Sequence, residues 1–138
     1  MSCTCCQGQM IGLHHIGVRT TDLAKTQAFY TDVLGFEMFK RVSLPQPNGT
    51  ATEIAFVRLG TLTLELIQPA DLTQVEKETG MVQHVAIAVK GIDGIVEKLK
   101  AKGVAFRTEE PVNNEPLNAK LIFFTGAAGE TLELFEDL

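Results

Sequence analysis

The sequence contains no tryptophan, a single tyrosine and only three cysteines. The cysteines are Cys3, Cys5 and Cys6, an odd number packed too closely to frame a set of disulfides, which agrees with a reducing compartment. A structural zinc site usually draws its ligands from two separated pairs, and no second cysteine pair exists. We therefore expect residues 1–10 to be a flexible Cys-rich tail, and a metal-binding or redox role for it is the less favoured alternative.

Long apolar runs and basic runs are also missing. No stretch approaches the roughly 20 apolar residues that a membrane span needs, and the N-terminus lacks the sections of a signal peptide, so we expect a cytoplasmic protein. Lysine and arginine number 12 against 17 aspartates and glutamates, which leaves no electrostatic footprint for nucleic acid or an anionic membrane. The 138 residues, 45% of them hydrophobic, suit one compact domain, which we expect to span residues 11–138.

The chain repeats itself. The tetrapeptide TLEL occurs at residues 63–66 and again at 131–134, and LHHIGVRTTDL, from Leu13, resembles VQHVAIAVKGID, from Val82. His15 precedes Glu65 by 50 residues and His84 precedes Glu133 by 49. A histidine and a glutamate at nearly the same separation in both halves indicate an internal duplication.

Each half has the same predicted order of elements, βαβββ. Module one (11–69) has strands at 13–19, 37–43, 51–59 and 61–68 and a helix at 22–34, for which Asp22 is the N-cap and Gly35 the end signal. A connector with a possible short helical turn covers 70–81. Module two (82–138) has strands at 83–89, 105–108, 120–125 and 131–136 and a helix at 93–102 that ends at Gly103. The fold class is therefore α+β.

Strand alternation places one histidine and one glutamate of each module on the face opposite the apolar, helix-facing residues. Small residues share this face: Gly17 beside the first histidine, Ala86 and Ala88 beside the second. The four ionisable residues that can line one concave surface are His15, Glu65, His84 and Glu133. Imidazole nitrogens and carboxylate oxygens suit a divalent ion such as Zn, Ni, Co, Mn or Fe, with two positions left open in an octahedral shell. His14 has the opposite parity, so we interpret it as a boundary residue or one that supports His15.

These segments, together with FYTDVLGF, LELIQP, GMVQHVAIAV and GETLELFED, resemble the vicinal oxygen chelate superfamily from Ile11 to Leu138. The superfamily includes glyoxalase I, methylmalonyl-CoA epimerase, fosfomycin-resistance enzymes, extradiol dioxygenases and bleomycin-binding proteins. The resemblance implies paired βαβββ modules that form a curved, cup-shaped, antiparallel-rich mixed sheet with flanking helices. It also implies one divalent ion per site, held by the four residues named above, and a homodimer.

The resemblance leaves several reactions open. The leading expectation is a glyoxalase I-like lyase or isomerase that removes a proton next to a metal-bound carbonyl, with Glu133 as base and Glu65 as the firmer ligand. Its substrate is then a small molecule with an α-carbonyl or a thioester, contacted by Arg19 and Phe135. A methylmalonyl-CoA epimerase-like enzyme is the alternative, favoured by Pro69, which stands where glyoxalase I usually has an asparagine for glutathione. A small-molecule binding or antibiotic-resistance protein is the alternative of another class, and a dioxygenase is less favoured.

Overall fold

A computed structural model describes residues 13–75 and 84–138. Module one contains β1 (Ile16–Arg19), α1 (Leu23–Ala28), η1 (Phe29–Val33), β2 (Glu37–Pro45), β3 (Ala51–Leu59) and β4 (Leu62–Gln68). After the short 3-10 helix η2 (Leu72–Gln74), module two contains β5 (Val85–Ala88), α2 (Ile92–Ala101), β6 (Val112–Asn114), β7 (Ala119–Thr125) and β8 (Thr131–Asp137). The predicted βαβββ order is confirmed in both modules.

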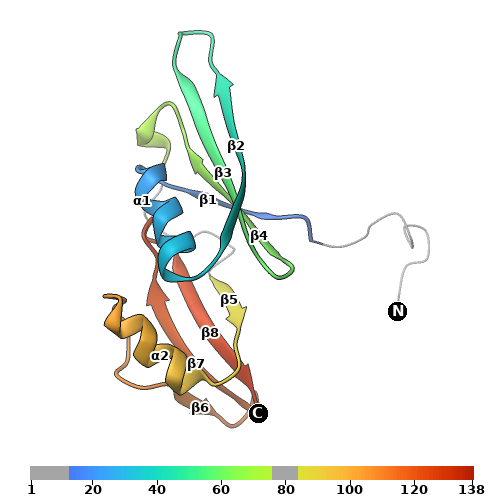
Figure 1. Cartoon of the computed structure of the whole chain (residues 1–138), viewed down its shortest axis with the longest axis vertical. Helices are drawn as coiled ribbons and strands as arrows, with labels where there is room; N and C mark the ends of the chain where they lie inside the picture. The colour runs from blue at the N-terminus through green and yellow to red at the C-terminus, as the bar shows by residue number, and fades with distance from the viewer. Residues whose placement is uncertain (1–12, 76–83) are drawn as a thin grey trace, which may run out of the picture.

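The two sheets have the same topology. The strand order is β1-β4-β3-β2 in the first and β5-β8-β7-β6 in the second. The first and last strands of each module pair in parallel, and the remaining neighbours are antiparallel. Figure 1 shows the sheets following one another along the long axis, with α1 and α2 on the same side of them.

The core lies between the sheets and these helices. Leu64 and Leu66 of β4, and Leu132 and Leu134 of β8, point into one buried apolar cluster that both modules share. Because side chains alternate along a strand, the intervening residues of β4 and β8 face the other way. We call this second side of each sheet the open face, and it carries the candidate site residues.

The helix signals are confirmed at both ends, with one irregularity. The Asp22 side chain accepts a hydrogen bond from the amide of Lys25 at the start of α1, and Gly35 and Gly103 adopt positive φ after the helices. The second half of the first helix is a π-helix, in which the amide of Leu34 donates to the carbonyl of Phe29. The sequence pattern did not predict this wider turn.

One predicted strand is wrong. Residues 105–108 do not form a strand, and only Phe106 makes an isolated bridge, to Phe124. The second strand of module two is β6, which begins after Pro111 and pairs with β7. Proline lacks a backbone N–H and the residue before it is restricted, so the chain pairs regularly only beyond it.

Within the described residues, no helix is long and apolar enough to cross a membrane.

Candidate metal centre

The first histidine–glutamate pair lies at the parallel junction of β1 and β4. Gly17 pairs with Glu65 in register, and His15 stands two residues before Gly17, on the same face. The Nε2 atom of His15 is 3.7 Å from Oε1 of Glu65. The parity expected for these two residues is confirmed.

The second pair repeats this arrangement at the junction of β5 and β8. Ala86 pairs with Glu133 in register, as Gly17 does with Glu65. The Nε2 atom of His84 is 3.5 Å from Oε1 of Glu133. The duplication seen in the sequence is therefore a duplication of geometry, down to the strand register.

Each pair also has a phenylalanine that the sequence reasoning missed. Phe56 pairs in register with Glu65, and Phe123 with Glu133. The rings stand edge-on to the imidazoles, with centroids 5.8 Å apart for His15 and Phe56 and 5.5 Å apart for His84 and Phe123. The signal was present, because a hairpin of known parity places each phenylalanine opposite its glutamate.

His14 contacts the first pair from outside. Its Nδ1 atom lies 2.8 Å from Nδ1 of His15. When the imidazole of His15 donates its proton at Nδ1, its Nε2 lone pair is left to face Glu65. This contact places His14 against the first proposed metal ligand, and its supporting role stays a prediction.

The two carboxylates have different surroundings. The side chain of Glu65 keeps 21% of its surface exposed, whereas that of Glu133 keeps 6%. Burial raises the pKa of Glu133, and the nearby His84 opposes this shift. The raised pKa makes Glu133 a stronger proton acceptor than an ordinary glutamate.

The two residues expected to contact substrate lie on the open faces. Arg19 ends β1, and its guanidinium donates a hydrogen bond to the carbonyl of Gln74 at 3.1 Å. Phe135 lies two residues beyond Glu133 and pairs in register with Ala88. Both residues thus follow a proposed ligand along its open face.

The donor chemistry of each pair fits a divalent ion. Two ligands of one ion lie about 3.0 to 3.4 Å apart when each bond is near 2.1 Å, so the observed pairs need to close only slightly. Both separations exceed the roughly 3.2 Å limit of a good hydrogen bond, so neither carboxylate is committed to its imidazole by a short bond.

The four residues form two pairs within one chain rather than one cluster. Among residues 13–75 and 84–138, no three histidine, cysteine, aspartate or glutamate side chains lie close enough together to hold an ion. Cys3, Cys5 and Cys6 lie outside the described residues. A four-ligand site therefore needs a further group beside each pair.

Comparison with known proteins agrees with this arrangement. The sequence profile of the Glyoxalase/Bleomycin resistance protein/Dioxygenase superfamily matches residues 12–134. Methylmalonyl-CoA epimerase from Bos taurus is 36% identical over 105 residues, which cover 71% of this chain and 58% of that protein. The uncharacterized protein YaeR of Escherichia coli is 31% identical over 134 residues, covering 92% of this chain and 99% of that protein.

A solved structure shows the same fold. The glyoxalase family protein from Enterococcus faecalis superposes with a TM-score of 0.74 at 23% identity, over 91% of this chain and 97% of that chain. The duplicated βαβββ modules and the profile match lead to one conclusion: the chain belongs to the Glyoxalase/Bleomycin resistance protein/Dioxygenase superfamily.

Proposed function

We propose that the protein is a metal-dependent enzyme that removes the proton next to the carbonyl of an acyl thioester and returns it to the opposite face, as a methylmalonyl-CoA epimerase does. The observation that carries the proposal is the duplicated pair, His15 with Glu65 and His84 with Glu133, at equivalent register positions. Two carboxylates from two modules supply the two proton-transfer groups that inversion requires.

The residues divide the chemistry as follows. A bound divalent ion supplies positive charge that stabilises the negative charge developing on the carbonyl oxygen. His15 and His84 are assigned to hold it, together with Glu65 and Glu133. Glu133 accepts the proton from the α-carbon because burial makes its charged form less stable and its proton affinity higher. Glu65, from the other module, donates to the opposite face the proton that it carries at the start of the cycle, so that each inversion ends with the proton on Glu133 and none on Glu65.

The thioester is favoured over a glutathione adduct by an observation at the end of β4. Pro69, where glyoxalase I usually has an asparagine, is buried and has no side-chain donor. The 36% identity to the bovine epimerase points the same way, although the chain spans only 58% of that relative's length.

A second copy of the chain is the group we propose to complete each site. The open faces carry exposed apolar side chains, Phe39 and Leu44 on the first sheet and Val112 on the second, with 40, 45 and 49% of their surfaces exposed. Apolar side chains that line a functional face favour burial against a partner. In a symmetric dimer, the first pair of one chain meets the second pair of the other, which gives two four-ligand sites.

The test measures metal content and α-proton exchange together. Elemental analysis is expected to give about one divalent ion per chain, and the loaded protein is expected to exchange the α-proton of methylmalonyl-CoA with deuterium. Glu133→Gln removes the base and should lower exchange by roughly a hundredfold or more. Glu97→Gln, on the exposed surface of α2, is the matched control and should leave exchange unchanged.

A glyoxalase I-like reaction is the second candidate, supported by Arg19 on the open face next to the first pair. Turnover of the hemithioacetal of methylglyoxal and glutathione, without exchange of methylmalonyl-CoA, would establish it instead. A metal-free protein that is inactive with both substrates would favour a small-molecule binding protein.

A further inference from the structure

A polar pocket lies at the end of the first sheet, where β4 leads into the connector between the modules. It has a volume of about 430 Å³ and is lined by the β2–β3 turn, the start of β3 and the segment after β4. Its lining residues are Gln46, Pro47, Asn48, Thr50, Thr52, Ala70, Asp71 and Gln74. This volume falls within the range of small-molecule sites.

The pocket continues the open face that carries the first pair. Thr52 and Phe56 have the same parity on β3, and Phe56 is in register with Glu65. Ile54 lies between them on this face, in register with Ile67 of β4. Thr52 and Phe56 are four positions apart on an extended strand, which places the pocket about 13 Å from the first pair along the sheet.

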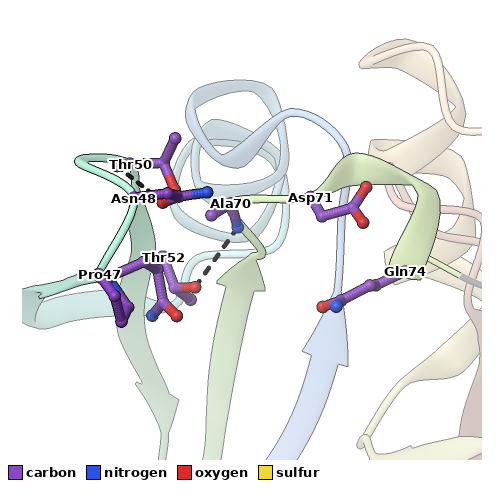
Figure 2. Close-up of a pocket in the computed structure, with 8 residues that line it drawn as sticks. Pro47, Asn48, Thr50, Thr52, Ala70, Asp71 and Gln74 are labelled. Atoms are coloured by element: carbon purple, nitrogen blue, oxygen red, sulfur yellow. Dashed lines mark hydrogen bonds between the residues drawn. The ribbon is translucent and has the colours of Figure 1, made fainter.

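Gln46, Asn48, Thr50 and Asp71 use side-chain groups in hydrogen bonds within the fold, so Thr52 and Gln74 are the lining residues considered for a ligand. The hydroxyl oxygen of Thr52 accepts only a long bond of 3.4 Å from the amide of Ala70. Figure 2 shows the Gln74 side-chain amide directed back toward the ends of β4 and β1, while Thr52 lies on the other side of β4. Thr52 and Gln74 therefore offer a hydroxyl and an amide to a ligand between them.

The charge of the pocket lining disfavours an anionic ligand, and the nearby guanidinium of Arg19 is already bonded to the carbonyl of Gln74. Among the described residues that line it, none is a lysine, arginine or histidine, and Asp71 is the one carboxylate. The Asp71 carboxylate accepts bonds from the amide and hydroxyl of Thr73. A phosphate would meet a negative charge here and no cation in the lining, whereas an uncharged amide or hydroxyl would find partners.

We propose that this pocket binds the uncharged amide-bearing arm of the thioester substrate, the pantetheine portion of a coenzyme A thioester, while its acyl end lies at the first pair. The inference rests on the proposed function. The amides and hydroxyl of the pantetheine arm follow the thioester at distances of the same order as the separation of pocket and pair. The phosphates at the far end of coenzyme A then lie beyond the pocket, in solvent.

The kinetic test removes the two polar groups without changing side-chain size. The variant Thr52→Val/Gln74→Leu is compared with Thr61→Val/Asn113→Leu, whose sites lie at the other end of the β3–β4 hairpin and on β6. Deuterium exchange is followed with methylmalonyl thioesters of coenzyme A, pantetheine and ethanethiol. The pocket variant should raise KM about tenfold for the first two and leave kcat unchanged, because the lost bonds lie away from the reacting carbon. The ethanethiol ester, which has no amide, should show no change.

An equal rise in KM for the ethanethiol ester, or no rise for the pantetheine ester, would overturn the assignment. A binding experiment separates this outcome from failure of the proposed function. Free pantetheine, titrated into the metal-loaded protein at millimolar concentration, should shift the backbone amide resonances of Thr52, Ala70 and Gln74 in wild type and not in the pocket variant. Absence of these shifts refutes the pocket, whereas absence of exchange with all three thioesters, with the shifts present, refutes only the epimerase reaction.

Discussion

The two modules place the proposed metal ligands at equivalent positions. Each places a histidine, a glutamate and a phenylalanine in the same register. Even the helix starts are held in the same way. The Gln68 side chain accepts a bond from the amide of Leu23, and the Glu136 carboxylate accepts bonds from the amides of Gly91 and Ile92. Gln68 and Glu136 each follow the strand glutamate by three residues, so the last strand of each module fixes both the ligand and the helix.

The modules differ in their outer strands and in some of the residues around the shared histidine and glutamate. Strand β2 has nine residues and its turn borders the polar pocket, whereas β6, its counterpart, has three. Arg19 of module one is matched by Ala88, and the partly exposed Glu65 by the buried Glu133. The residues present in both modules are those we assign to the ion. The positions that differ in residue type or in burial are those we assign to the substrate and to the base.

The largest expected effect comes from two variant chains, each with the ligands of a different module replaced by alanine. One chain carries His15→Ala/Glu65→Ala and the other His84→Ala/Glu133→Ala. Each alone should lose exchange activity by roughly a thousandfold, because a general base and half of the ligands are gone. In a dimer with shared sites, an equal mixture should recover about a quarter of wild-type activity, since half of the dimers are mixed and each has one intact site.

The control for this mixing experiment is a mixture of two chains altered in the same module, His15→Ala with Glu65→Ala, which cannot rebuild a complete first pair in any site. Native mass spectrometry reports whether mixed dimers form. Mixed dimers without recovered activity would contradict sites shared between chains.

The next effect concerns the junction between modules. The hydroxyl of Tyr30, fully buried in η1, donates a 2.6 Å hydrogen bond to the carboxylate of Glu130, in the turn before β8. Tyr30→Phe removes a bond to a charged acceptor and should lower the free energy of unfolding by about 2 kcal/mol, which corresponds to a fall in Tm of roughly 6 °C. Calorimetry measures the shift, with Glu97→Gln as the control.

The junction also predicts a pH dependence. Burial first, and the carboxylate of Glu130 second, raise the pKa of Tyr30 above its usual value. Above about pH 10 the unfolded chain loses this proton and the folded chain keeps it, so wild-type stability should fall as the pH rises. Tyr30→Phe should lack this component, and parallel alkaline profiles for the two proteins would contradict the assignment.

A smaller effect is expected at His14, which contacts the proposed metal ligand His15 in module one. His14→Ala removes the contact to Nδ1 of His15, and loss of such a supporting bond lowers metal affinity by about tenfold or more. Competition with a chelator measures the affinity. His14→Asn keeps a side-chain amide and should retain part of it, and Leu13→Ala, at an exposed neighbour, should retain all of it. An unchanged affinity for His14→Ala would show that Glu65 alone orients His15.

The sequence predicted the repeated features well because they depend on alternation and spacing. The parity of His15 and Glu65 follows from the period of a strand, and the ends of the helices follow from Asp22, Gly35 and Gly103. In both copies, leucines that face the helices alternate with glutamates on the open face, and this alternation can be read from the sequence.

What could not be predicted depends on contacts between segments far apart in the chain. The partners of Tyr30 and Arg19 lie 100 and 55 residues away, and local patterns carry no information about them. The pocket beside Thr52 arises where the β2–β3 turn and the segment after β4 meet in the folded chain. Residues 105–108 read as a strand because of their apolar content, but Pro111 delays regular pairing to β6.

The smallest expected effect tests how far the two modules are interchangeable at the site. Gly17 and Ala86 hold the same position, each in register with its strand glutamate. A Cβ added at Gly17 would lie 3.6 Å from Cδ1 of Ile67 and 3.9 Å from Oε1 of Glu65, which are ordinary contacts. Gly17→Ala, which gives module one the residue of module two, should therefore change stability by less than about 0.5 kcal/mol.

The exchange rate measured with Gly17→Ala should likewise stay within about twofold of wild type, because a single methyl group fits the space without moving Glu65. Gly17→Leu is the contrasting variant, since its branched side chain extends over the Glu65 carboxylate and should lower both metal affinity and exchange. If Gly17→Ala already has the effect expected of Gly17→Leu, then the bound substrate approaches the backbone of β1 more closely than that of β5. In that case Gly17 is one of the substrate-facing residues that differ between the modules, and only the histidine and the glutamate are equivalent at the site.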